Sequence, residues 1–181
     1  MATKRLVIDG YGQVELNNVA FRRDGRIVAQ CAPDATVPVV ENGMILAVDE
    51  ANRTVKFATG NSLPLALVYS AEHMYDERMP GLKNFKLNGS DDFLPRLGYL
   101  AVGDKWYTNT ICYSDKEYTD EAMLITALKA YKTATVYGKA DATGAVYLTA
   151  AAPTAGLKLK VIEYGTMPDG QKGVKLQVLD V

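Results

Sequence analysis

The chain has 181 residues, of which 48% are hydrophobic, enough for one domain with a sizeable core or for two small ones. Twenty basic and 21 acidic residues leave a net charge of −1 without a basic stripe, so we expect no nucleic-acid partner and no electrostatic binding to a membrane. No apolar run reaches the length of a membrane helix or of a signal peptide. We therefore expect a chain made and kept in the cytoplasm, or assembled there into something larger.

Short β-strands are predicted at the start of the chain. Residues 5–8 form an apolar run that ends at a turn, and residues 13–16 alternate polar and apolar side chains as a half-buried strand does. Asp24-Gly25 lies between the apolar runs 19–21 and 27–29. Because Asp-Gly readily adopts the positive φ angles of tight turns, this segment predicts a hairpin.

The next third of the chain combines a second hairpin with a region of irregular structure. Residues 44–48 and 54–57 predict the two strands of that hairpin, and residues 65–69 a further strand. Three prolines within residues 63–103 argue against long regular elements there. Residues 72–92 are expected to form a long loop, and its large apolar side chains should pack on its own domain or on a neighbour.

One helix is predicted after residue 118. Thr119 is expected to cap it, and Asp120 and Glu121 in its first turn complement the helix dipole. Its apolar side chains recur at helical spacing on one face: Leu124, Leu128 and Tyr131. A strand over residues 123–126 is the alternative.

The C-terminal part returns to β structure. Residues 133–137 and 145–149 flank a loop and predict a hairpin. Residues 157–161 and 174–178 alternate apolar side chains with Lys or Gln on either side of the turn Pro168-Asp169-Gly170. This is the clearest amphipathic hairpin in the chain, and its lysines are expected to guard an exposed sheet edge.

These elements predict a mainly β protein, α+β overall. We expect a β-sandwich or β-barrel-like part over residues 1–113 and a smaller α+β part with a C-terminal hairpin over residues 119–181. The polar residues between them are expected to form a linker.

Residues that commonly carry chemistry are few. His73 is the only histidine, which leaves little for a zinc site or a histidine-activated nucleophile. Cys31 and Cys112 are distant in sequence and are interpreted as two buried thiols. Adjacent acidic pairs such as Asp49-Glu50 fall at expected turns or at the helix start, and Gly10-Tyr11-Gly12 lacks the third glycine of a dinucleotide site. We therefore expect no enzyme, no catalytic residues, no metal and no cofactor, with an enzyme using Glu72, His73 and Asp76 as a remote alternative.

Aromatic residues indicate a binding surface instead. Eleven tyrosines outnumber four phenylalanines and one tryptophan, and tyrosine combines a large apolar area with a hydroxyl group. Aromatic and arginine side chains are typical anchors of protein interfaces. The candidate partner-binding residues are Tyr75, Phe85, Arg96, Tyr99, Trp106 and Tyr107. Ordinary core packing of Tyr99 and Trp106 is an equal alternative, and a sugar-binding groove is a weaker one.

The layout of residues 37–113 resembles a known class. An apolar run with the turn Asn42-Gly43 leads into residues 44–46, and the runs 63–68 and 100–109 follow, the last containing Gly103-Asp104 and Thr108-Asn109. This pattern is similar to that of tailed-phage capsid decoration, or auxiliary head, proteins. It does not extend beyond residue 119.

The resemblance implies a β-rich fold without a cofactor that stabilises the capsid by binding the major capsid protein, as a homo-oligomer. It also implies a location on the capsid surface of the virion after synthesis in the host cytoplasm. The alternatives are a head fibre, tail or baseplate component, and a carbohydrate-binding or adhesion module.

Overall fold

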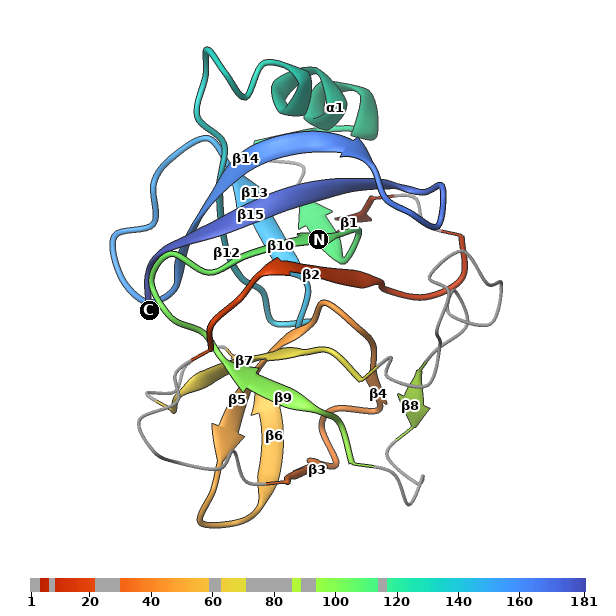
Figure 1. Ribbon diagram of the computed structural model, residues 1–181, viewed down its shortest axis with the longest axis vertical. Helices are drawn as coiled ribbons and strands as arrows, with labels where there is room; N and C mark the ends of the chain where they lie inside the picture. Colours follow the sequence, from red (N-terminus) through yellow and green to blue (C-terminus); the bar gives the residue numbers. More distant parts are fainter. Residues whose placement is uncertain are drawn as a thin grey trace.

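A computed structural model of the chain describes residues 4–6, 9–21, 30–58, 63–70, 86–88, 94–113 and 117–181. In these ranges β-strands dominate and a short α-helix, α1, lies above the larger of two main sheets (Figure 1). The mainly β class predicted from the sequence is confirmed. No helix in the described part of the chain has the length and apolar character needed to cross a membrane.

The larger sheet has eight strands in the order β1-β11-β13-β12-β14-β15-β10-β2. Their bounds are β1 (Lys4–Arg5), β2 (Val14–Asn18), β10 (Lys105–Thr108), β11 (Ile111–Tyr113), β12 (Tyr137–Ala140), β13 (Val146–Thr149), β14 (Lys158–Thr166) and β15 (Lys172–Asp180). Neighbouring strands are antiparallel except for β11 and β13, which are parallel.

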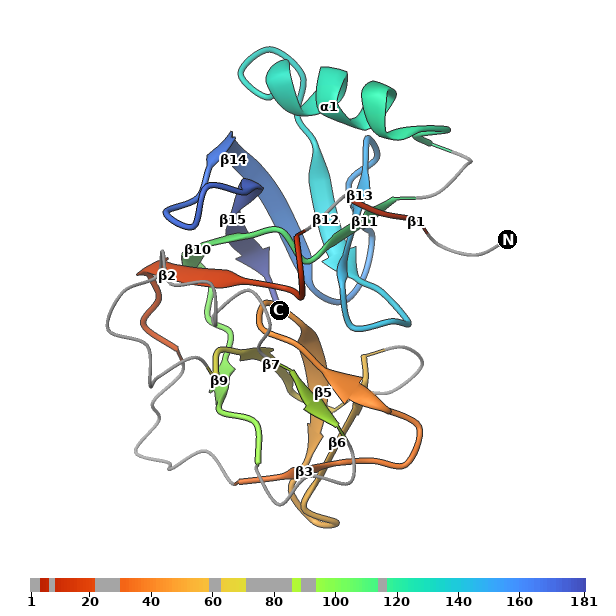
Figure 2. The same cartoon turned by 90° about the vertical axis from the view of Figure 1, so that its right-hand side faces the viewer.

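This sheet curls back on itself at Asn109 and Thr110. These two residues join β10, which pairs with β15, to β11, which pairs with β13. The two halves of this bent segment, β10 and β11, are therefore linked through the neighbouring strands β15, β14, β12 and β13. The result is a barrel-like arrangement (Figure 2). The N-terminal residues follow the bent segment, because β1 pairs with β11 and β2 pairs with β10.

The smaller sheet lies below the larger one in Figures 1 and 2 and has the order β3-β6-β5-β7-β9. Its strands are β3 (Ala32–Pro33), β5 (Ile45–Asp49), β6 (Thr54–Phe57), β7 (Leu65–Val68) and β9 (Leu97–Tyr99). A separate two-stranded ladder joins β4 (Val39–Val40) to β8 (Leu87–Asn88). The predicted hairpin of residues 44–48 and 54–57 is confirmed as β5 and β6.

Helix α1 (Glu121–Lys129) forms where the sequence predicts it, one residue later at its start. Asp120, not Thr119, is the N-cap residue, and its carboxylate accepts a hydrogen bond from the Met123 amide at 2.8 Å. Leu124 and Leu128 are fully buried as expected. Tyr131 lies beyond the last helical residue but still packs on the same core.

Two apolar cores are present among the described residues. The first joins both sheets, because Ile45 and Leu67 of the smaller sheet pack with Trp106, Ile111 and the inner side chains of β14 and β15. The second lies on the other face of the smaller sheet and includes Leu46 and Val48. Strand β5 is therefore buried on both faces, which explains its continuous apolar sequence.

The two predicted C-terminal hairpins are confirmed. Strands β12 and β13 form the first, although β12 begins at Tyr137 rather than at Thr133. In the second, formed by β14 and β15, the alternating apolar side chains are buried. The prediction that its lysines guard a sheet edge is wrong, because β14 also pairs with β12 and β15 also pairs with β10.

The predicted division at residues 113–119 does not follow the strands. The eight-stranded sheet takes β1, β2, β10 and β11 from one side of that boundary and β12–β15 from the other. The strands separate differently: residues 32–99 supply the smaller sheet, and the segments before and after supply the larger one. The predicted hairpin at Asp24-Gly25 and most of the predicted loop 72–92 lie outside the described residues.

Candidate functional site

The structure does not gather the six candidate partner-binding residues into one surface. Tyr75 and Phe85 lie outside the described residues. Arg96 is exposed just before β9, and its amide donates a hydrogen bond to the Ser70 hydroxyl oxygen at 2.7 Å. Trp106 and Tyr107 are consecutive in β10, so their side chains point to opposite faces of the sheet.

Trp106 and Tyr99 are core residues. Trp106 has no exposed surface and packs in the core that joins the two sheets. Tyr99 is 8% exposed and packs in the second core, and its hydroxyl group donates a hydrogen bond to the Glu50 carboxylate. This burial favours the core-packing alternative for both residues, and it removes the tryptophan face that a sugar would stack on.

Tyr107 lies on the outer face of the larger sheet, over two glycines that face each other across β14 and β15. Gly165 pairs with Gly173, and a Cβ atom on Gly165 would lie 2.6 Å from the Tyr107 hydroxyl oxygen. Met167 packs against Gly173 beside the same ring. The ring thus covers backbone that has no side chain of its own, which is a known way to compensate for glycine in a sheet.

The hydroxyl group of Tyr107 is buried without a hydrogen-bond partner in the described structure. Burial, followed by the negative charge of Glu163, raises the pKa of Tyr107 to about 12. A tyrosine held neutral in this way contributes apolar area rather than proton transfer at neutral pH.

Several described carboxylates hold turns or strand ends in place. Asp104 accepts hydrogen bonds from the amides of Ala20 and Ala101 at 2.7 and 3.0 Å. Glu117 accepts one from the Thr149 hydroxyl at 2.6 Å and one from the Ala150 amide at 2.9 Å. These bonds give the carboxylates structural tasks at separate points of the fold.

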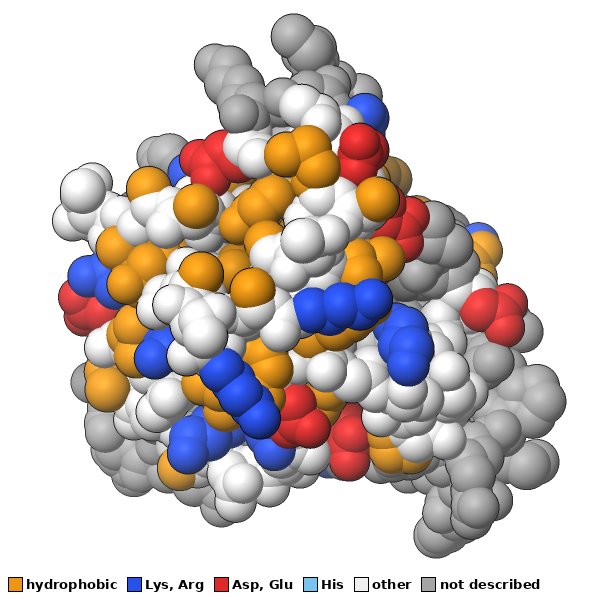
Figure 3. Space-filling view, turned by 90° about the horizontal axis from the view of Figure 1, so that it is seen from above, with side chains coloured by type: hydrophobic (Ala, Val, Ile, Leu, Met, Phe, Trp, Pro, Cys, Tyr) orange, Lys and Arg blue, Asp and Glu red, His pale blue; other side chains and the backbone are white. Residues whose placement is uncertain are grey.

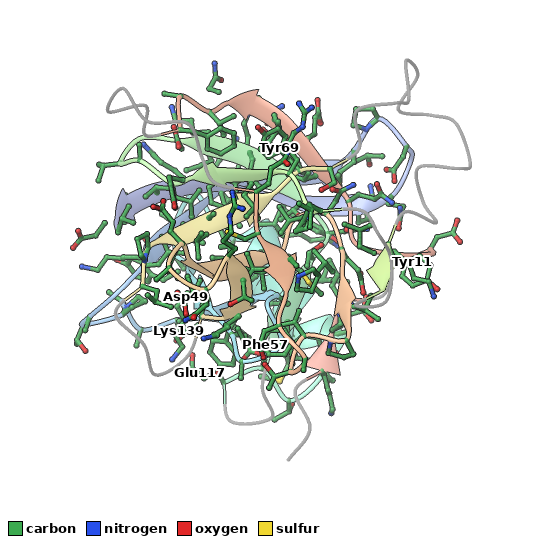
Figure 4. All side chains as sticks on the ribbon, turned by 90° about the horizontal axis from the view of Figure 1, so that it is seen from below. Tyr11, Asp49, Phe57, Tyr69, Glu117 and Lys139 are labelled. Carbon is green, nitrogen blue, oxygen red and sulfur yellow. The ribbon has the colours of Figure 1, made fainter. Side chains whose placement is uncertain are left out.

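Asp49 closes the turn between β5 and β6. Its carboxylate accepts hydrogen bonds from the Asn52 side chain at 2.8 Å and the Lys56 ammonium group at 3.0 Å. These bonds lower the pKa of Asp49 to about 2, the bond from Asn52 contributing most. Figure 4 labels Asp49 well apart from Tyr11 and Tyr69.

A buried polar junction lies where the N-terminal segment crosses between the two sheets. Glu41, 6% exposed, accepts hydrogen bonds from the Gly12 amide at 2.6 Å and from both terminal nitrogens of Arg5 at 3.2 and 3.1 Å. The Thr110 hydroxyl donates to the Asn42 carbonyl at 2.7 Å in the same place. The residues come from the N-terminal segment, the β4–β5 connection and the β10–β11 bend, so the junction ties both sheets together.

The same junction extends to the β14–β15 turn. Asn109 accepts a hydrogen bond from the Gln13 amide at 2.7 Å and donates one to the Gln171 side chain at 3.1 Å. The Asp9 amide donates to that same Gln171 oxygen at 2.7 Å. Hydrogen bonds between buried polar groups specify how strands pack. In this junction the Arg5 Nε and Asn42 Nδ2 atoms are buried without a hydrogen-bond partner in the described structure.

The thiols and the acidic groups offer no metal or nucleophile site in the described ranges. Cys31 and Cys112 are free and buried, as predicted, and burial raises the pKa of each thiol. No three His, Cys, Asp or Glu side chains of the described residues come close enough to hold a metal ion. His73 and Asp76 lie outside those residues.

The outer face of the larger sheet carries lysines in register. One cross-strand row joins Tyr137, Lys160, Gln177 and Lys105 from β12, β14, β15 and β10. Lys139 lies two residues from Tyr137 on β12, opposite Tyr147, with its ammonium nitrogen 5.0 Å from that ring's centre. Because directly paired residues share a face, these side chains form one surface.

A second row on this face includes Tyr107. It runs from Glu163 through Lys175 and Tyr107 to Glu15. We call Lys105, Lys139, Lys160 and Lys175 the lysine face. In the sequence, Lys160 and Lys175 each alternate with apolar residues, which predicts that they point away from the core. Lys105 and Lys139 are placed on the same face only by the register in which their strands pair. Figure 3, which views the molecule from above, shows Lys and Arg side chains lying among hydrophobic ones.

The chain matches no protein-family model, no curated protein and no solved structure.

Proposed function

We propose that this chain is a structural protein of a tailed-phage particle that binds and stabilises the capsid shell through contacts with the major capsid protein. Two observations support it: the resemblance in residues 37–113, and the hydrogen bonds by which buried polar side chains of the described residues join the two sheets. The observation that carries it is the buried polar junction around Glu41.

That junction supports a binding body rather than a catalytic one. It ties two sheets with a shared core into one unit, and its charged groups are bonded to each other and to backbone amides. A protein that reinforces a shell needs a body that keeps its shape under load, and the hydrogen bonds from Arg5 and Gly12 to the buried Glu41 carboxylate add rigidity where the two sheets meet. The outer sheet face then offers lysine and tyrosine side chains to a partner.

Co-sedimentation with assembled capsids of the phage that encodes the chain tests the proposal. We expect the chain to pellet with expanded, DNA-free shells and to raise the temperature at which those shells come apart. Shells that neither bind the chain nor gain stability from it would refute the proposal. Density confined to a tail, baseplate or fibre in a particle map would favour those locations instead.

A further inference from the structure

We propose that the lysine face docks on an acidic patch of a protein surface. This inference deepens the proposed function and rests on it, because it names the part of the chain that meets the partner. The chain has a net charge of −1, so the four lysines of this face do not simply reflect an overall excess of positive charge.

Two of the four lysines, Lys105 and Lys160, lie close enough for their fields to add. Lys160 and Lys105 are separated by Gln177 alone in the cross-strand row, which places their backbones roughly 10 Å apart at about 4.8 Å per strand. That spacing is about one Debye length at 0.1 M salt. None of the four lysines forms an ion pair with any residue in the described part of the chain. Their positive charge therefore remains available to a partner.

The lysine stems and nearby rings also provide apolar area. Lys105, Lys160 and Lys175 are partly buried although they point outward, so their methylene groups lie along the sheet. Tyr137 and Tyr147 are partly exposed on the same face. A surface that combines charge with tyrosine is typical of protein interfaces, where charge steers the approach and rings contribute contact area.

An acidic protein surface fits this face better than a nucleic acid does. The lysine face contains no arginine, the residue best suited to bidentate phosphate contacts. Glu15 and Glu163 flank Lys175 and Tyr107 in the second row, and their carboxylates would repel a phosphate backbone. On a protein partner, the same two carboxylates can meet amide or ammonium donors beside an acidic patch.

The test compares two triple variants of the full chain in capsid binding. In the first, Lys105, Lys139 and Lys160 are changed to Gln; in the control, Lys129, Lys132 and Lys172 are changed to Gln, giving the same loss of charge outside the lysine face. We expect the first variant to bind capsids at least about tenfold more weakly, because it loses three exposed charge pairs with the partner, and the control to bind like the natural chain. Thermal unfolding of each variant checks that the fold is retained.

Further arms separate the possible outcomes. A Lys→Arg triple variant at the same positions should retain binding because it keeps the charge. Equal binding by the natural chain and the first Gln variant would overturn the inference and leave the proposed function standing. If the natural chain itself fails to bind capsids, the proposed function fails, and binding to poly-glutamate then tests the lysine face alone. Salt-sensitive binding to poly-glutamate that is lost only in the first Gln variant would support the inference. The absence of such binding would overturn the inference. Tighter binding to duplex DNA than to poly-glutamate would also overturn it.

Discussion

The carboxylate of Glu41 receives the guanidinium group of Arg5 through two hydrogen bonds, at 3.2 and 3.1 Å, inside the junction between the two sheets. Arg5 precedes the crossing segment and Glu41 lies just before β5, so this pair joins the beginning of the larger sheet to the smaller one. The third hydrogen bond to the carboxylate comes from the Gly12 amide, which lies within the crossing segment itself.

We expect Glu41→Ala to lower the free energy of unfolding by about 2–4 kcal/mol, because it leaves a buried amide without an acceptor and a partly buried guanidinium without its partner. Urea denaturation measures this change. Glu163→Ala is the matched control, since Glu163 is exposed on the outer sheet face, and it should change stability by less than about 0.5 kcal/mol. Equal effects of the two substitutions would show that the junction does not stabilise the fold.

Gly12 is expected to tolerate no side chain. A Cβ atom there would lie 2.6 Å from the Asn42 carbonyl oxygen, a backbone atom that cannot move without disturbing the junction. Gly12→Ala should therefore cost about 3 kcal/mol or more, measured by thermal or urea unfolding. Gly156→Ala is the control: its positive φ of 69° imposes strain of about 1 kcal/mol, but nothing lies within 4 Å of the added Cβ. A Gly12 variant no less stable than the Gly156 variant would contradict the close crossing.

Removing the hydroxyl group of Tyr107 should be nearly neutral. It is buried without a hydrogen-bond partner, so Tyr107→Phe should change the free energy of unfolding by less than about 1 kcal/mol and in the stabilising direction, whereas Tyr107→Ala should cost about 3–5 kcal/mol. Denaturation of the two variants side by side measures the difference. A large loss in the Phe variant would mean that the hydroxyl group has a partner after all.

The same residue predicts a response to alkaline pH. Since burial raises the pKa of Tyr107 to about 12 in the folded state, above about 10 in the unfolded chain, its contribution to stability is complete below pH 10 and declines as the pH rises toward 12. Tyr107→Phe should therefore flatten the fall in stability over this window. Identical pH profiles for the two proteins would contradict the raised pKa.

Asp49 predicts a response at the acidic end. The hydrogen bonds from Asn52 and Lys56 lower its pKa to about 2 in the folded state, so it stabilises the fold above pH 3.8 and loses that effect as the pH falls toward 2. Carboxyl NMR titration measures the pKa directly, and Asp49→Asn should lack this part of the acid response. An Asp49 that titrates near 3.8 would show that the turn is not held as described.

Local structure was predictable wherever a pattern repeated over a few residues. The alternation in residues 157–161 and 174–178, the apolar run of β5 and the spacing of Leu124 and Leu128 each report which side of an element is buried, and burial follows directly from hydrophobicity. The mainly β class and the buried thiols were predictable for the same reason.

The sharing of one sheet by strands from both sides of residues 113–119 was not predictable in this way. Strand order depends on pairing between segments far apart in the chain, such as β1 with β11 and β2 with β10. Short strands leave register weakly specified by their own residues. The polar composition of the segment between residues 113 and 119 does not indicate which sheet the strands on either side of it join.

The candidate surface shows the same distinction. The amino-acid sequence alone shows that tyrosine is abundant, that charge is balanced and that lysines alternate with apolar residues in two C-terminal segments. The three-dimensional fold is needed to place Trp106 in the core and Tyr107 on the opposite face of β10, where it is also buried. The fold also brings Lys105 and Lys139 onto one face with Lys160 and Lys175. The physical reason is that a surface is made by cross-strand neighbours, and register between distant strands is set by packing across the whole sheet rather than by adjacent residues.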